Sequence, residues 1–336
     1  MKRAAIASIV MCAAAPVMAA AWHTQASTAA RTDAPHLPVV LTPHYAVGDS
    51  LRYQVSLRSQ TKSLVSGAVQ NPEGATELGI AVGLTLHLEV LKPVPVAAPA
   101  KRPAGSDERV PLRLRATYER VSAELLGDSF DPSAVKLLAP YKNLEGHAIE
   151  FQLGTHGEVE YMQGLEEVVQ DARVLEAARG WLEQLGAGLG APVTGIAPGQ
   201  SWNRTKEIPE APLNGTQLET ASTYLRDEPC EIEKPAGDQC AVVLMRFSMR
   251  QKPGEKNATP EAFRKNGLRT SGTWTSHGES LIYVSLRTGR TVSVTQSSEE
   301  LMDLNIRHEN GGMPFRYAGR ATNETHLLLL DDHTGQ

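Results

Sequence analysis

Two cysteines, Cys230 and Cys240, are the residues whose type and spacing most directly predict chemistry. The segment between them contains proline, glycine and aspartate, which favour a tight turn. The third cysteine, Cys12, lies in an N-terminal stretch that we expect to be removed. An even number of cysteines in an exported chain indicates a disulfide. We therefore predict a structural Cys230–Cys240 bridge at the base of a hairpin. A redox pair or a metal site would need a second cysteine pair or a nearby histidine, and neither is present.

Catalytic motifs are not found at the spacings that chemistry requires. The sequence has no Gly-x-Ser-x-Gly elbow and no His-Glu-x-x-His pair. Ser59 to Lys62 and Ser133 to Lys136 fit Ser-x-x-Lys, but the partner motif Ser-Asp-Asn is missing. The ten histidines are scattered, and none converges with carboxylates at a metal-ligand spacing. We predict no catalytic residue, no metal and no cofactor, and keep an enzyme with an unrecognised site as the less favoured alternative.

A signal peptide is predicted over residues 1–21. Two basic residues open it, an apolar stretch follows, and Ala19 and Ala21 each fit the small-x-small rule for cleavage. The apolar stretch is too short to span a membrane, and no later stretch is long enough. Met11 precedes Cys12 where a lipid-attachment signal needs a small residue, which argues against an anchor. The sequence thus predicts a periplasmic or secreted protein.

The charge balance argues against nucleic acid as a partner. The whole chain has 33 Lys and Arg residues against 38 Asp and Glu. Cleavage removes Lys2 and Arg3, so the mature chain has a net charge of about −7. Nucleic-acid binding depends on a basic surface, which this composition does not supply.

Alternating apolar and polar residues predict an antiparallel β-rich protein. Seven apolar residues from Leu78 to Val90 recur with period two and indicate one long strand with one buried face. Val82, Leu84 and Leu86 lie in its middle. Similar alternation follows in at least six further segments, and a change of apolar phase predicts a bulge near Arg120. Clean alternation is typical of antiparallel sheets with one solvated face.

One segment has helical periodicity instead. Apolar residues from Leu165 to Leu185 recur at helical spacing, acidic residues occupy the opposite face, and glycines follow. We therefore divide the mature chain into a flexible leader (22–46), an N-terminal antiparallel β half (47–164), a connecting amphipathic helix (165–190) and a C-terminal antiparallel β half (191–336).

The two β halves are similar to each other in sequence. The first opens with Val47-Gly48-Asp49-Ser50-Leu51 and the second with Pro198-Gly199-Gln200-Ser201-Trp202. Each half later contains a hairpin with threonine and glycine at the turn, within 151–159 and 284–292. These parallels predict an internal duplication of a curved β-meander.

These segments together resemble a family of exported bacterial β-rich proteins whose function is not established. The resemblance rests on the opening at 198–202, on the segment 271–279, on Thr288-Gly289-Arg290 and on 302–306, and it covers about 47–308. Gln200 stands where the family pattern has aspartate. The resemblance implies no catalytic residue.

More loosely, the predicted architecture is similar to the half-barrels of periplasmic lipoprotein carriers, which bind acyl chains on a concave apolar face. By this analogy we expect the helix to cover part of the sheet and leave an apolar concavity near Val82, Leu84 and Leu86. The expected function is a non-catalytic envelope protein that binds an apolar ligand or a protein partner. A structural or assembly factor is the alternative.

Overall fold

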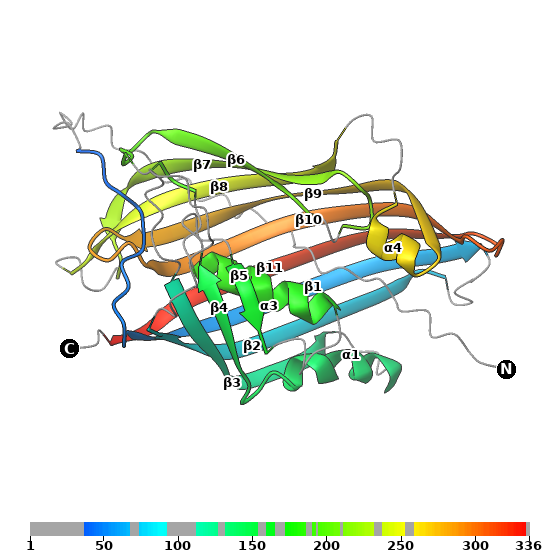
Figure 1. Cartoon of the computed structure of the whole chain (residues 1–336), viewed down its shortest axis with the longest axis horizontal. Helices are drawn as coiled ribbons and strands as arrows, with labels where there is room; N and C mark the ends of the chain where they lie inside the picture. Colours follow the sequence, from blue (N-terminus) through cyan, green and yellow to red (C-terminus); the bar gives the residue numbers. More distant parts are fainter. Residues whose placement is uncertain are drawn as a thin grey trace, which may run out of the picture.

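The described residues form one large curved antiparallel sheet with a few helices (Figure 1). In this computed structural model they are 37–67, 74–92, 112–126, 132–153, 159–164, 172–185, 190–192, 194–208, 211–231, 237–252 and 259–333. The helices are α1 (Pro132–Lys142), α3 (Ala172–Leu185) and α4 (Glu261–Lys265). The strands are β1 (Ser50–Gly67), β2 (Thr76–Val90), β3 (Leu112–Leu126), β4 (Ala148–Leu153), β5 (Val159–Gln163), β6 (Ser201–Glu207), β7 (Thr216–Pro229), β8 (Gln239–Gln251), β9 (Leu268–Ser285), β10 (Thr291–His308) and β11 (Phe315–His333).

The strand order is β5-β4-β3-β2-β1-β11-β10-β9-β8-β7-β6. The first five strands run outward from the middle of the sheet, and the last six run inward from the other edge. The two series meet where β1 pairs with β11 over its whole length, from Ser50 opposite His333 to Gly67 opposite Phe315. The predicted mainly β, antiparallel fold is confirmed, and its two halves are joined edge to edge in a single sheet.

The predicted bulge near Arg120 is present in β3. Gly83 of β2 pairs with Ser122 and Thr85 pairs with Glu119, so Arg120 and Val121 together face one residue. Arg120 has a φ of 50°, the only positive value among the non-glycine residues that the structure describes. The extra residue shifts the apolar phase, so the buried face of β3 is kept on both sides of the bulge.

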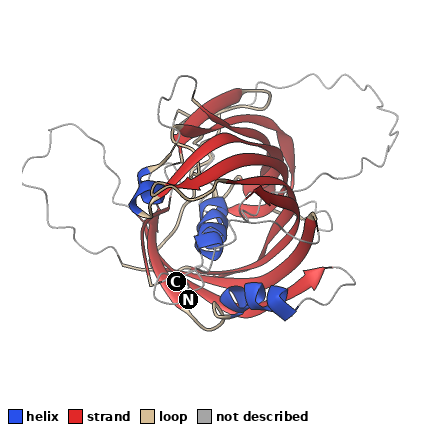
Figure 2. Cartoon of the chain, turned by 90° about the vertical axis from the view of Figure 1, so that its right-hand side faces the viewer, coloured by secondary structure: helices blue, strands red, loops and turns tan. Residues whose placement is uncertain are grey.

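The sheet curves around α3, which lies on its concave side (Figure 2). The helix buries one stripe of side chains against the apolar residues of β1 to β4, and it also packs against β10. The stripe has helical spacing and consists of Val174, Ala178, Trp181, Leu182 and Leu185. The first part of the predicted helix, 165–171, lies outside the described residues. This packing forms the main core of the protein.

The part of the predicted leader that the structure describes, 37–46, is packed on the fold. Val39 pairs with Ile196, Leu41 is buried, and the backbone N–H of His44 donates to the carbonyl of Thr288 at 2.8 Å. This close contact between the N-terminal segment and the β9–β10 hairpin requires glycine at position 289, because a Cβ there would lie 2.1 Å from the carbonyl oxygen of Thr42. Residues 37–46 are thus held against the fold, while 22–36 and the predicted signal peptide lie outside the described residues, and the leader boundary at residue 46 stays a prediction.

The openings of the two halves have the same local structure. The N–H of Ala46 donates to the side chain of Asp49 at 2.8 Å, and the N–H of Ala197 donates to the side chain of Gln200 at 2.9 Å. The intervening glycines have φ values of 94° and 86°. The two threonine-glycine hairpins fall between the fourth and fifth strand of each half, although 154–158 lie outside the described residues. An internal duplication stays a prediction, which these equivalent turns favour.

Candidate functional site

The residues predicted to bind a ligand lie in the main core. Val82, Leu84 and Leu86 expose 3%, 3% and 0% of their surface and pack in the same cluster as α3. The open apolar concavity that we expected is therefore not present at these three side chains. Their role in binding stays a prediction, and a ligand would have to displace the residues packed around them.

The predicted disulfide is present. Cys230 and Cys240 are bonded with an S–S distance of 2.06 Å and a Cα–Cα distance of 5.0 Å. The N–H of Cys230 donates to the carbonyl of Asp238 at 2.9 Å, which closes the connection between β7 and β8. The bridge lies at the end of the strands and is a structural element.

The concave face becomes polar toward its middle. One row of directly paired residues crosses seven strands there, and such residues point to the same face of a sheet. We call it the central row: Ser59, Asn323, Ser298, Gly278, Phe247, Thr220 and Arg204. Its first three members expose 2%, 3% and 6% of their surface, so the polar side chains are enclosed.

Two further rows flank the central row on the same face. We name each by its residue on β10. The Gln296 row contains Leu57, Thr325, Gln296, Ser280, Met245, Ser222 and Trp202. The Glu300 row contains Thr61, Ala321, Glu300, Ser276, Met249, Leu218 and Lys206. Polar residues thus concentrate on β9, β10 and β11, and apolar residues on β8.

Glu300 is a buried carboxyl group without a charged partner in the part of the chain that the structure describes. It exposes 3% of its surface, and the indole Nε1 of Trp274 donates a hydrogen bond to its Oε1. Burial raises the pKa of Glu300 to about 8, and the bond from Trp274 opposes this shift only in part. At neutral pH the group is therefore mainly an uncharged carboxylic acid, which can donate as well as accept a hydrogen bond.

The hydroxyl of Tyr118 is buried without a partner in the main core, and around the polar rows three further side-chain oxygens are buried without a partner among the described residues. They are Oε2 of Glu300, Oδ1 of Asn323 and Oε1 of Gln184. Asn323 lies in the central row and Glu300 in the next row, one strand over. Gln184 reaches the Gln296 row from α3, because its Nε2 donates to Oε1 of Gln296 at 3.0 Å. Each unsatisfied buried group costs roughly 1–3 kcal/mol, so three in neighbouring rows call for an explanation.

The C-terminal end of α3 is fixed by hydrogen bonds that place Gln184. The hydroxyl of Thr291 donates to the carbonyl of Gln184 at 3.2 Å, and the hydroxyl of Tyr45 donates to the carbonyl of Leu185 at 3.4 Å. The guanidinium of Arg290 lies 5.1 Å from the centre of the Tyr45 ring. The N-terminal segment and the β9–β10 hairpin thus hold the helix end against the sheet.

A second apolar cluster lies beyond the Glu300 row and is separate from the main core. Trp274, Met302, Leu304 and Ile306 form it on β9 and β10, and the segment around Leu213 covers it. The concave face therefore runs from an apolar region closed by α3, through the polar rows, to an apolar region closed by the connection between β6 and β7.

Between these clusters, β8 presents half-buried apolar side chains to the interior. Met245 packs on the edge of the main core and Met249 on the edge of the second cluster, while Phe247 belongs to neither. The Phe247 ring lies over Gly278, where an added Cβ would be 2.6 Å from its Cζ and 1.9 Å from Cβ of Ser298. The Phe247 ring thus extends along the central row over Gly278, toward Ser298 on β10.

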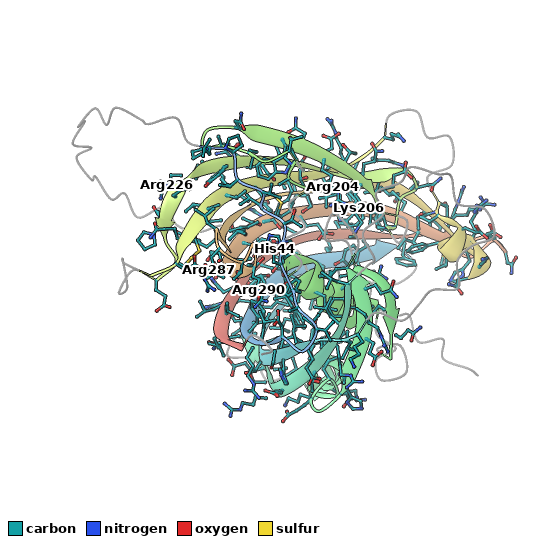
Figure 3. All side chains as sticks on the ribbon, turned by 60° about the vertical axis from the view of Figure 1, so that its left-hand side comes forward. His44, Arg204, Lys206, Arg226, Arg287 and Arg290 are labelled. Atoms are coloured by element: carbon teal, nitrogen blue, oxygen red, sulfur yellow. A yellow bond between two sulfur atoms is a disulfide. The ribbon has the colours of Figure 1, made fainter. Side chains whose placement is uncertain are left out.

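The free edge of the central and Glu300 rows is basic. Arg204 and Lys206 end these rows on β6 and are labelled in Figure 3. Arg204 is half-buried, and its Cδ would be 3.2 Å from a Cβ added at Gly190. Arg204 therefore contacts the chain that follows α3.

The same described residues contain neither a metal site nor a membrane-spanning helix. No group of three or more His, Cys, Asp or Glu side chains is placed to hold a metal ion. None of the described helices is long and apolar enough to cross a membrane.

Sequence reasoning missed Gln184, Asn323 and Glu300, although a signal for Glu300 existed. The alternation that placed Met302 and Ile306 on one face of β10 also places Glu300, Ser298 and Gln296 on that face. Polar residues in the apolar phase of a strand are the sign of a buried polar site. Asn323 has the same signal, because it follows Ala321 and precedes Thr325 and Leu327 in the buried phase of β11, whereas Gln184 has no comparable local signal.

No model of a known protein family matches the chain, and no curated protein matches it. The solved structure titled "Lipid-protein interactions in lipovitellin" aligns with a TM-score of 0.41 and 12% identity, over 87% of this chain and 26% of that chain. This chain thus spans about a quarter of the length of that one. The likeness is to a part of its fold, and the suspected family of exported β-rich proteins stays a prediction.

Proposed function

We propose that this protein is a non-catalytic binding protein of the bacterial envelope that holds an amphipathic ligand on the concave face of its sheet. The single observation that carries the proposal is the arrangement around Phe247. Half-buried apolar side chains of β8 stand there beside buried polar groups that lack partners. An apolar chain could lie along β8 while a polar end reaches β10 and β11.

The chemistry of this face favours binding over catalysis. Glu300 has a raised pKa, which is a common feature of functional sites, but its side chain accepts a hydrogen bond from the indole of Trp274, and the described residues hold no group of ligands for a metal ion. Apolar contact with β8 would supply affinity, since each buried methylene group stabilises a complex by about 0.8 kcal/mol.

Export to the envelope is supported by two features of different kinds. The first 21 residues have the pattern of a signal peptide. The Cys230–Cys240 disulfide suits an oxidising compartment such as the periplasm. Both agree with a ligand carrier that works outside the bacterial cytoplasm.

The test uses the full chain purified after export and the neutral fluorescent dye Nile red as a probe. We compare the wild type with Phe247→Asp, which puts a charge on the inner face, and with Phe247→Ala, which only removes the ring. Ser248→Asp is the matched control, because its side chain lies on the opposite face of the same strand. Circular dichroism verifies that each variant is folded.

We expect the wild type and Ser248→Asp to bind the dye equally, Phe247→Ala to bind it more weakly, and Phe247→Asp to bind it at least tenfold more weakly. Release of a bound molecule from the wild type in native mass spectrometry would agree with this. Equal binding by all four proteins, or no binding by the wild type, contradicts the proposal. The second result would favour a structural or assembly role.

A further inference from the structure

We infer that the polar end of the bound ligand is uncharged and carries hydroxyl groups, and that Gln184, Asn323 and Glu300 receive it. The inference rests on the proposed function, because it names the chemistry of the ligand for the same face. It follows from which hydrogen-bonding atoms the protein leaves unpaired and from the charges around them.

The unpaired atoms are all oxygens, and two of them belong to side chains that are 97% buried. Glu300 and Asn323 each expose 3% of their surface, and the unpaired oxygen of Gln184 is buried as well. Carbonyl oxygens of asparagine and glutamine only accept hydrogen bonds. The group that satisfies them must donate, which excludes ligand ends that are esters or ethers alone.

The positions of the three oxygens suit a ligand end with more than one contact. They belong to three successive rows of the face. Alternate residues of a strand are separated by about 6.6–6.8 Å, so the outer two rows are on the order of 13 Å apart. Asn323 stands between the other two, so a ligand end that carries more than one hydroxyl could contact Asn323 and also a neighbouring row.

The surrounding charges argue against an anionic ligand end such as a phosphate or a carboxylate. The amide oxygens of Asn323 and Gln184 would turn their lone pairs toward it. The basic residues on this face, Arg204 and Lys206, lie five strands from Asn323. At about 4.8 Å per strand this is roughly 24 Å along the sheet.

A permanently cationic end fits less well than a hydroxyl. Glu300 is mainly uncharged at neutral pH, so it offers a cation no fixed counter-charge. An uncharged carboxyl can donate one hydrogen bond and accept another, and a hydroxyl has the same two capacities. The two groups are therefore complementary without any change of charge on binding.

The decisive experiment compares two ligands that share a chain and an oxygen but differ in whether that oxygen carries a hydrogen-bond donor. Oleyl alcohol and its methyl ether have the same chain and the same oxygen, but only the alcohol donates a hydrogen bond. Each is titrated against Nile red bound to the full-length wild type. We expect the alcohol to bind on the order of tenfold more tightly, as one or two buried hydrogen bonds would produce.

Variants show which residues cause the preference for the alcohol over its methyl ether. Asn323→Leu and Glu300→Leu should lose the preference for the alcohol, and Glu300→Gln should keep most of it, because the carboxamide still donates and accepts. Glu299→Gln is the control, since Glu299 lies on the opposite face of β10 and pairs with Arg320. The comparison on the wild type alone stays informative if a leucine variant fails to fold.

The outcomes separate this inference from the proposed function. If neither ligand displaces the dye, the proposed function fails. If both bind equally well, the function stands and the inference is overturned, with water as the partner of these oxygens. Tighter binding of oleylamine than of the alcohol, rising with pH as Glu300 ionises, would also overturn it in favour of a cationic end.

Discussion

Arg290 donates a hydrogen bond to the carboxylate of Asp49 across 241 residues of the chain. The two side chains are almost completely buried, with exposures of 4% and 1%. Nε of Arg290 also donates to the carbonyl of His44 at 3.0 Å. The pair joins the opening of β1 to the hairpin between β9 and β10, and His44 and Arg290 can be followed in Figure 3.

Removal of the arginine should destabilise the whole fold. Arg290→Met leaves the carboxylate of Asp49 buried without its partner, and breaking a buried pair in this way costs about 3–5 kcal/mol. Urea denaturation measures the loss. Arg287→Met is the control, because Arg287 is exposed in the same hairpin. A change of less than about 1 kcal/mol in Arg290→Met would show that the pair contributes little to stability.

Stability should fall as the pH rises through the range in which Glu300 ionises. Its pKa in the folded protein is raised from 4.5 to about 8, so the folded state holds this proton more tightly than the unfolded state. The stabilisation is fully present below pH 4.5 and is lost as the pH rises to about 8 and beyond.

The loss amounts to a few kcal/mol, since one pKa unit corresponds to about 1.4 kcal/mol. Glu300→Gln should flatten the pH dependence of urea denaturation between pH 5 and 9. Glu299→Gln should leave it as in the wild type. Parallel pH curves for the wild type and Glu300→Gln would contradict the raised pKa.

Two glycine substitutions should change stability in opposite directions. An added Cβ at Gly278 would lie 1.9 Å from Cβ of Ser298, so Gly278→Ala should destabilise by about 1–3 kcal/mol or more through overpacking. Gly180 in α3 has no atom within 4 Å of an added Cβ, so Gly180→Ala should stabilise by about 0.5–1 kcal/mol. Thermal unfolding gives both values. Stability changes of the same sign for the two variants would contradict the packing around Gly278 and Gly180.

The disulfide should stabilise the protein and be closed in exported material. A loop as short as that between Cys230 and Cys240 is expected to contribute about 2.5–3 kcal/mol. Cys230→Ser combined with Cys240→Ser should lower the urea midpoint accordingly. Mass spectrometry of the denatured wild type should detect no alkylation until a reductant is added, and two free thiols would contradict the bridge.

The sequence by itself determined the local elements of this protein. Period-two alternation located many of the strands, such as the one from Leu78 to Val90, and a change of phase located the bulge at Arg120, whereas β7, β11 and α1 were not predicted. Helical spacing located the buried stripe that contains Leu182 and Leu185. These features follow from the sequence because each depends on the direction in which neighbouring side chains point.

Only the tertiary structure decided how the strands are ordered and where the polar residues meet. Backbone hydrogen bonds between strands are the same for any sequence, so alternation alone does not reveal that β1 pairs with β11. That pairing brings Asn323 beside Ser298 and Ser59, and the curvature brings Gln184 of α3 over Gln296. The sequence also suggested an open apolar face at Leu84, which the packing of distant elements closed. A site assembled from strands and a helix far apart in the chain depends on long-range packing, which local periodicity does not record.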